Sequence, residues 1–175
     1  DMAGAASPQA VQVGGPSGTL VPPTQFGRQI CFEDLATGGS VVVFGSERNL
    51  LEIVRTYQAF FAHESCGYCT PCRVGNELLI QYLDRVLAER GEPDDVTAMT
   101  RVATTMKSSS RCGLGQTACN PVLSSLEGFR HLYEARTSED PGGNRRAFDL
   151  EEATASHGAL RGLSPTVEEL PDWAD

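Results

Sequence analysis

Two different spacings of hydrophobic and polar residues divide the chain. Up to about residue 45, short apolar runs alternate with glycine-rich segments, as is typical of β-strands and tight turns. Residues 11–13 form one predicted strand, which enters a turn at 14–18, and residues 30–32 and 41–44 form two more. Because 41–44 is apolar without interruption, we expect that strand to be buried on both faces. Three short strands make a thin sheet, which needs another element to pack against.

From Ser46 onward the apolar residues recur at helical spacing. Ser46 is predicted to cap a first helix, a second covers about residues 70–90, and the third and fourth begin at Pro93 and Pro121. Their expected buried stripes are Leu50, Val54, Tyr57 and Phe61; Leu79, Leu83, Val86 and Leu87; Val96, Met99, Val102 and Met106; and Val122, Leu126, Phe129 and Tyr133. Amphipathic helices with short connections predict a four-helix bundle, so the predicted fold class is α+β.

Composition adds a third segment and excludes two classes of partner. Residues 138–175 carry nine acidic residues and three arginines, a net −6 out of −9 for the 175-residue chain, and are predicted to form an acidic tail. An acidic chain without clustered cations is not a nucleic-acid binder. No apolar run reaches the roughly 20 residues that a membrane span needs. The predicted segments are therefore 1–45, 46–137 and 138–175.

The six cysteines carry the chemical signal. Cys66, Cys69 and Cys72 form a C-x2-C-x2-C motif, and three thiolates at this spacing fit three corners of an iron–sulfur cube if the backbone turns sharply. Gly67 permits that turn, and Pro71 is tolerated at the start of the following helix. The motif predicts an iron–sulfur site at the beginning of the second helix.

A fourth ligand has to come from elsewhere in the chain. Cys112 lies in a loop with Gly113 and Gly115, between the third and fourth helices, and is the preferred candidate. Cys119 is the alternative, although it stands at the entry to a helix. Arg73 directly follows Cys72, and Arg111 directly precedes Cys112. We therefore expect both arginines to contribute positive electrostatic potential around the cluster.

Other interpretations of the cysteines are weaker. A structural zinc site takes its ligands in two separated pairs rather than as a triplet with one distant residue. Disulfides are disfavoured because nothing marks the chain for export. Cys31 stands between Ile30 and Phe32 in a predicted strand, where we expect a small core residue.

The cysteine motifs and their flanking residues resemble a known family. The strings ESCGYCTPCRVGN, FFAHES and RCGLGQTACNP resemble the NADH-oxidising flavoprotein subunits of respiratory complex I and their relatives. VQVGGPSG, FEDLATGGS, NLLEIV and FDLEEA are most similar to the diaphorase flavoprotein subunits of NAD-reducing nickel–iron hydrogenases. The flavoprotein subunits of NAD-dependent formate dehydrogenases are the next most similar group. The resemblance covers about residues 11–153.

The resemblance implies a fold and a cofactor. It implies the end of a β-grasp-like (SLBB) domain followed by a four-helix bundle that carries a [4Fe–4S] cluster. Carried over by position, the ligands are Cys66, Cys69, Cys72 and Cys112. The Gly113–Leu114 loop would face the isoalloxazine ring of FMN. In the family the FMN and NAD(H) sites precede the β-grasp domain, so we expect them on residues that this sequence does not contain, in a longer polypeptide or in a separate one.

These implications lead to a functional hypothesis and an alternative. The first is an electron-relay part of an NAD(H):acceptor oxidoreductase in the cytoplasm, which passes single electrons between FMN and an iron–sulfur centre on a partner subunit. The partner would belong to a hydrogenase, formate dehydrogenase or complex I-like assembly. The alternative is a non-catalytic module in which a metal only stabilises the helices and supports assembly.

Overall fold

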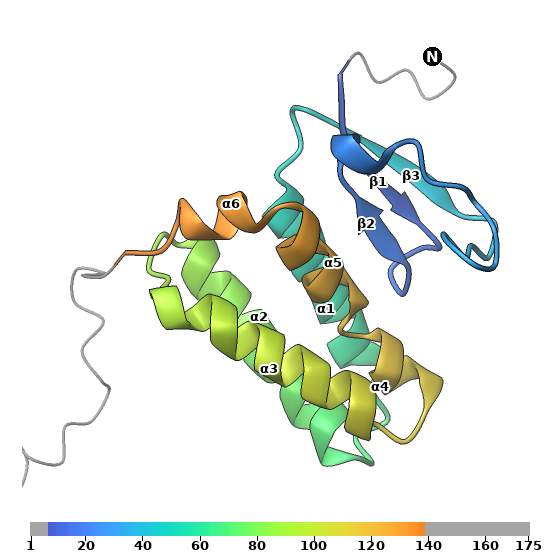
Figure 1. The fold of residues 1–175 in the computed structure, drawn as a ribbon. Helices are drawn as coiled ribbons and strands as arrows, with labels where there is room; N and C mark the ends of the chain where they lie inside the picture. Colours follow the sequence, from blue (N-terminus) through green and yellow to red (C-terminus); the bar gives the residue numbers. More distant parts are fainter. Residues whose placement is uncertain (1–6, 139–175) are drawn as a thin grey trace, which may run out of the picture. The chain divides into compact units, whose positions relative to one another are not determined.

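The computed structural model describes residues 7–138 (Figure 1). Three strands, β1 (Pro8–Val13), β2 (Thr19–Val21) and β3 (Val41–Gly45), form an antiparallel sheet in the order β2-β1-β3. The helices are η1 (Pro23–Gln25, a 3-10 turn), α1 (Leu50–Glu64), α2 (Thr70–Leu87), α3 (Pro93–Ser109), α4 (Gly113–Thr117), α5 (Asn120–Gly128) and α6 (Arg130–Glu134). The predicted mixture of a small sheet and helices, the α+β class, is confirmed.

The first strand and its turn agree with the prediction, but the second strand does not. Val13 leads into a turn in which Gly14 has φ +90°, a backbone conformation that favours glycine. A Cβ atom at Gly18 would clash with the carbonyl oxygen of Val13, so this turn closes tightly. The strand that follows this turn and pairs with one side of β1 is β2 at Thr19–Val21, and its three residues are too few for a periodicity to show.

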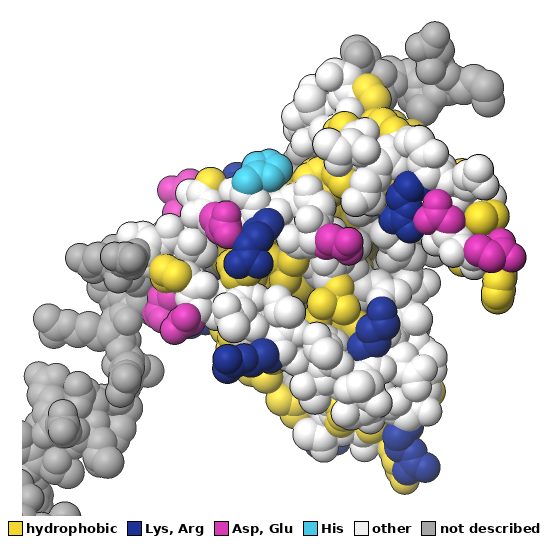
Figure 2. All heavy atoms as spheres, in the orientation of Figure 1, with side chains coloured by type: hydrophobic (Ala, Val, Ile, Leu, Met, Phe, Trp, Pro, Cys, Tyr) yellow, Lys and Arg dark blue, Asp and Glu magenta, His cyan; other side chains and the backbone are white. Residues whose placement is uncertain are grey.

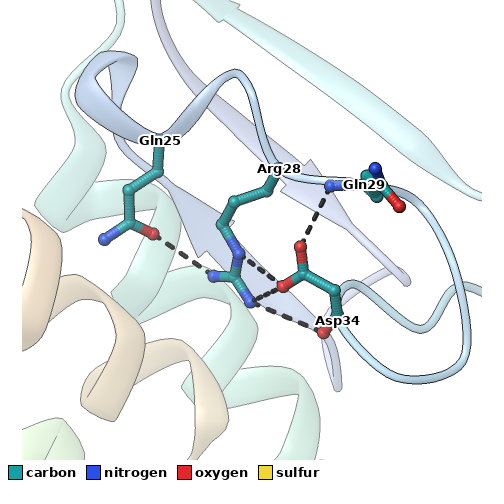
Figure 3. A network of polar contacts seen from close by, with 4 residues as sticks. All are labelled: Gln25, Arg28, Gln29 and Asp34. Atoms are coloured by element: carbon teal, nitrogen blue, oxygen red, sulfur yellow. Dashed lines mark hydrogen bonds and ion pairs between the residues drawn. The ribbon is translucent and has the colours of Figure 1, made fainter.

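The expected strand at residues 30–32 is wrong. This segment lies in a loop that is folded by polar contacts (Figure 3). Arg28 donates hydrogen bonds to Asp34 and to the Gln25 side chain, and the Gln29 N–H donates to Asp34 at 3.0 Å. The Arg28 hydrogen bond is the main reason why the pKa of Asp34 is lowered. Ile30 and Phe32 are 57% and 91% exposed, so their apolar character does not reflect burial.

Two further expectations for this part of the chain are wrong. Cys31 is a half-buried loop residue and not a residue of a strand or of the core. Strand β3 exists where it was predicted, but Val41 and Val42 are exposed rather than buried on both faces. β3 is an edge strand of a sheet with only three strands, so the side chains of a neighbouring strand flank its side chains on one side only.

The sheet packs against α5 through one of its faces. Ala10 and Leu20 belong to the same hydrophobic core as the buried residues of the helices. The backbone N–H of Leu20 donates to Ser124 Oγ at 3.1 Å, and Asn120 donates to the carbonyl oxygen of Ser17 at 2.6 Å. A second, small cluster on the sheet contains Val13, Val21 and Leu35. The sheet therefore completes the core of the helical part.

The helices lie where they were predicted, but one cap, one helix break and one additional helix differ from the prediction. Asn49, not Ser46, caps α1, where its side chain accepts a hydrogen bond from the Leu51 N–H at 3.1 Å. The predicted fourth helix is divided into α5 and α6 at Phe129, whose backbone leaves the helical conformation. The one-turn helix α4 was not predicted. Of the predicted stripe residues, Tyr57, Leu87 and Val102 are only partly buried, and the others are buried.

On the face that Figure 2 shows, positively charged Lys and Arg side chains are interspersed with negatively charged Asp and Glu side chains. No helix among residues 7–138 is both long and apolar enough to cross a membrane.

The fully buried Tyr133 provides a test of the core. Its hydroxyl lies 2.6 Å from Ser125 Oγ, and burial raises the pKa of Tyr133 above its ordinary value. Tyr133→Phe is expected to cost about 1 kcal/mol of unfolding free energy at pH 7, because one buried hydrogen bond is lost.

The pH dependence of that difference separates burial from other effects of the substitution. Above pH ~10 the tyrosine of the unfolded state ionises first, so the wild-type chain loses stability that the Tyr133→Phe chain keeps. Urea unfolding at pH 7 and pH 11 should show the two curves converging. A stability difference that does not change with pH would contradict this account.

Candidate metal centre

The C-x2-C-x2-C segment forms the connection between α1 and α2. Helix α1 ends at Glu64, and Gly67 adopts φ +74°, the left-handed conformation that reverses the chain direction. The Arg73 guanidinium donates to the carbonyl oxygen of Gly67 at 2.5 Å and closes the loop. Cys69 then occupies the N-cap position of α2, and Pro71 lies in the first turn of this helix. The sharp turn predicted for the triplet is therefore present.

The segment around Cys112 forms the connection between α3 and α4. Helix α3 ends at Ser109, Ser110 continues in extended conformation, and Cys112 is the N-cap residue of α4. Gln116 of α4 donates to the Ser110 carbonyl oxygen at 3.0 Å, which folds this short helix back onto the end of α3.

The two cysteine-bearing loops lie against each other. The backbone N–H of Arg111 donates a hydrogen bond to the Cys69 sulfur. This hydrogen bond is the largest cause of the lowered pKa of the Cys69 thiol. The Arg111 guanidinium also donates to the Tyr68 hydroxyl at 3.1 Å and stacks 4.9 Å from the centre of its ring. A Cβ atom on Gly115 would lie only 3.0 Å from Cys72 Cβ. These contacts bring the triplet and the Cys112 loop to one place.

The four predicted ligands differ in exposure. Cys72 is buried, Cys69 is half-buried, and Cys66 and Cys112 are exposed. Within residues 7–138, no three His, Cys, Asp or Glu side chains are grouped as ligands of one metal ion. A cube differs from a single ion here, because each of its thiolates binds a different iron. Four free thiols on two abutting loops, with a lowered pKa at Cys69, are a donor set that suits a [4Fe–4S] cluster.

Cys119, the alternative fourth ligand, has different surroundings from Cys112. Cys119 is fully buried in the hydrophobic core, and its thiol donates to the Gln116 carbonyl oxygen at 3.5 Å. Burial raises the pKa of Cys119, so its thiol keeps its proton more firmly than an exposed one. Its surroundings are those of a core residue.

The other predicted site residues occupy different positions. Arg73 donates to a backbone oxygen of the triplet loop and Arg111 to the Tyr68 hydroxyl, and this favours a role in holding the loops. Gly113 is exposed, and nothing lies within 4 Å of a Cβ built on it. Leu114 is half-buried and packs against the helical core.

Sequence reasoning missed two polar residues beneath the triplet. Gln58 of α1 and Asn76 of α2 are fully buried, and Asn76 contacts both the carbonyl oxygen and the sulfur of Cys72. A signal was present, because both residues occupy core-facing positions in helices whose stripes are otherwise apolar.

Comparison with known proteins defines the class of this site. Residues 52–136 match the family described as the NADH-ubiquinone oxidoreductase-F iron-sulfur binding region. This match begins in α1 and ends after α6, so it contains both cysteine-bearing loops. That part of the chain belongs to this iron–sulfur family, and the resemblance to NADH-oxidising flavoprotein subunits is confirmed.

Individual relatives agree with the family. The chain is similar to the NAD-reducing hydrogenase HoxS subunit alpha of Cupriavidus necator, with 38% identity over 89% of this chain and 26% of that protein. It is also similar to an NADH-quinone oxidoreductase subunit of Streptomyces coelicolor, with 33% identity over 71% of this chain and 28% of that protein. The chain therefore spans about a quarter of the length of these relatives.

A solved structure supports the same fold. The crystal structure of an NAD+-reducing [NiFe]-hydrogenase in the H2-reduced state matches 94% of this chain and 29% of its own chain, with a TM-score of 0.73 and 37% identity. The iron–sulfur binding region is thus embedded in a fold shared with a hydrogenase subunit.

Proposed function

We propose that Cys66, Cys69, Cys72 and Cys112 hold a [4Fe–4S] cluster. The observation that carries this proposal is the contact between the two loops, through the Arg111 N–H at Cys69 and through Gly115 at Cys72. The family of iron–sulfur binding regions supports it. When bound, such a cluster takes up and releases one electron at a time.

We propose that the chain is the electron-relay part of an NAD(H):acceptor oxidoreductase. The relatives named for NAD-reducing hydrogenase and NADH-quinone oxidoreductase support this class of enzyme. The cluster would connect FMN, which exchanges electron pairs with NAD(H), to a one-electron centre on another subunit. We place the FMN and NAD(H) sites on residues beyond this sequence, since the chain matches only 26% of the hydrogenase relative.

The protein's own residues would do three things for this relay. Arg73 closes the triplet loop on Gly67, and Arg111 ties the Cys112 loop to Tyr68. The first turn of α2 directs the backbone N–H of Cys72 toward the Cys69 sulfur and would stabilise the negative charge of a thiolate there. The exposure of Cys66 and Cys112 leaves one side of the site open to an electron partner.

We further propose how the rest of the chain contributes. Residues 1–45 would be the end of a β-grasp-like (SLBB) domain, residues 46–137 a four-helix bundle of α1, α2, α3 and α5 with α6, and residues 138–175 an acidic tail, which lies almost entirely outside the described residues. The exposed Gly113 supports a loop that faces the flavin, whereas Leu114 packs inward. A reducing compartment, the cytoplasm, suits free thiols that bind iron.

Metal and sulfide content test the proposal directly. The chain, purified without oxygen, is expected to contain about four irons and four sulfides and to give an EPR signal after reduction by dithionite. Zinc without sulfide or an EPR signal would overturn the relay and would support the assembly module instead. If the cluster is present, copurification identifies the electron partner. We expect subunits of a hydrogenase, a formate dehydrogenase or a complex I-like enzyme.

A further inference from the structure

Two buried amides connect α1 to the innermost cysteine of the triplet. Gln58 and Asn76 are each 0% exposed, and Gln58 Nε2 donates to Asn76 Oδ1 at 2.5 Å. Asn76 Nδ2 donates to the Cys72 carbonyl oxygen at 2.8 Å and lies 3.5 Å from Cys72 Sγ. Ser65 Oγ lies 3.4 Å from the same sulfur. Two side chains thus place polar groups at the Cys72 sulfur, and Asn76 does so from inside the protein.

The orientation of the Asn76 amide follows from its neighbours. The Cys72 carbonyl group is an acceptor only, so the atom of Asn76 that faces it has to be the N–H2 group. Its oxygen then faces Gln58, whose N–H2 group donates to it. Gln58 thereby holds Asn76 with a donor directed at the sulfur.

Packing alone does not account for this pair. Burying two amides between helices costs free energy that apolar side chains of similar size do not cost. Gln58 Oε1 is buried and has no hydrogen-bond partner in the part of the chain that the structure describes. The arrangement therefore includes an unsatisfied acceptor while delivering one N–H donor to Cys72.

We infer that Asn76 is a positioning residue that donates an N–H group to the Cys72 thiolate and raises the reduction potential of the cluster, with Gln58 holding the amide in place. The inference rests on the proposed [4Fe–4S] cluster. Reduction adds one electron, so the reduced cluster is the more negative state and gains more from a donor at its sulfur ligand. Removing the donor lowers the potential.

Three variants separate an effect on potential from an effect on packing. Asn76→Leu removes the donor to Cys72 and leaves Gln58 without its acceptor. Gln58→Leu leaves Asn76 next to Cys72 but removes its anchor. The double variant replaces both amides by apolar side chains, which restores much of the stability that each single change loses.

The measurements are an EPR-monitored redox titration and urea unfolding of the full chain with its cluster. Asn76→Leu and the double variant are expected to lower the ratio of reduced to oxidised cluster at a fixed potential by roughly three- to tenfold, where tenfold corresponds to about 59 mV. Gln58→Leu is expected to change this ratio less, although it also destabilises the fold.

The outcomes are distinguishable. A potential that follows stability, falling in both single variants and recovering in the double variant, would overturn the inference, as would an unchanged potential in the double variant. If Asn76→Leu alone does not hold a cluster, the double variant decides. A wild-type chain without a reducible cluster would instead overturn the proposed function on which the inference rests.

Discussion

Cys112→Ser is expected to remove the cluster's EPR signal and most of its iron, whereas Cys119→Ala keeps both. Cys112 is exposed in the loop that contacts the triplet, so its thiolate is free to bind iron. Cys119 is in the hydrophobic core, and its thiol donates to the Gln116 carbonyl oxygen of the preceding helix α4. A cluster that lacks one of its four protein ligands loses iron or is not assembled.

Iron and sulfide assays of the two variants, together with EPR after reduction, check this result. Urea unfolding provides the control, because Cys119→Ala leaves a small cavity and is expected to cost about 1 kcal/mol without loss of iron. If the cluster survives Cys112→Ser but not Cys119→Ala, the assignment of the fourth ligand is wrong.

Helical spacing made the helical part of this fold accessible from the sequence. Leu79, Leu83 and Val86 recur at intervals of three and four, and all three are buried in α2. The spacing of apolar residues shows only that they share one side of a helix. It did not reveal the break at Phe129, where α5 ends and α6 begins. Helix α4 was missed for a related reason, because its five residues are too few for an apolar position to recur along one face.

The sheet was less accessible because its apolar residues have different surroundings. Phe32 and Val42 look like core residues in the sequence, yet one lies in an exposed loop and the other on an edge strand. Which strand pairs with which depends on contacts between distant residues, such as those of Leu20 with α5. Such contacts override local preference for strand structure.

The candidate site was predictable where chemistry depends on spacing and unpredictable where it depends on tertiary contact. The spacing of Cys66, Cys69 and Cys72 indicated a cluster directly. The partnership of Asn76 with Gln58 depends on how α1 packs against α2, which no local pattern contains. The close approach of Gly115 to Cys72 is of the same kind, because the two residues lie on different helices.

Gly115→Ala is expected to force the two cysteine-bearing loops apart. A Cβ atom at this position would lie 2.6 Å from Ser110 Cβ and 3.0 Å from Cys72 Cβ. Both of these atoms are attached directly to the backbone, so relief requires the loops to move and not only a side chain to rotate. Overpacking of this kind costs about 1–3 kcal/mol, which exceeds the gain of about 1 kcal/mol from placing Ala in a helix.

Gly113→Ala is the matched control in the same short helix. Nothing lies within 4 Å of a Cβ atom at Gly113, and neither glycine has a positive φ, so Ala fits the backbone at both positions. Urea unfolding should therefore show Gly113→Ala between the wild-type stability and about 1 kcal/mol above it, and Gly115→Ala below the wild-type stability. The iron content should fall only in Gly115→Ala, because the separation of Cys72 from the Cys112 loop displaces ligands of one cluster. Equal stability and iron content in the two variants would mean that the contact between the loops is not what assembles the site.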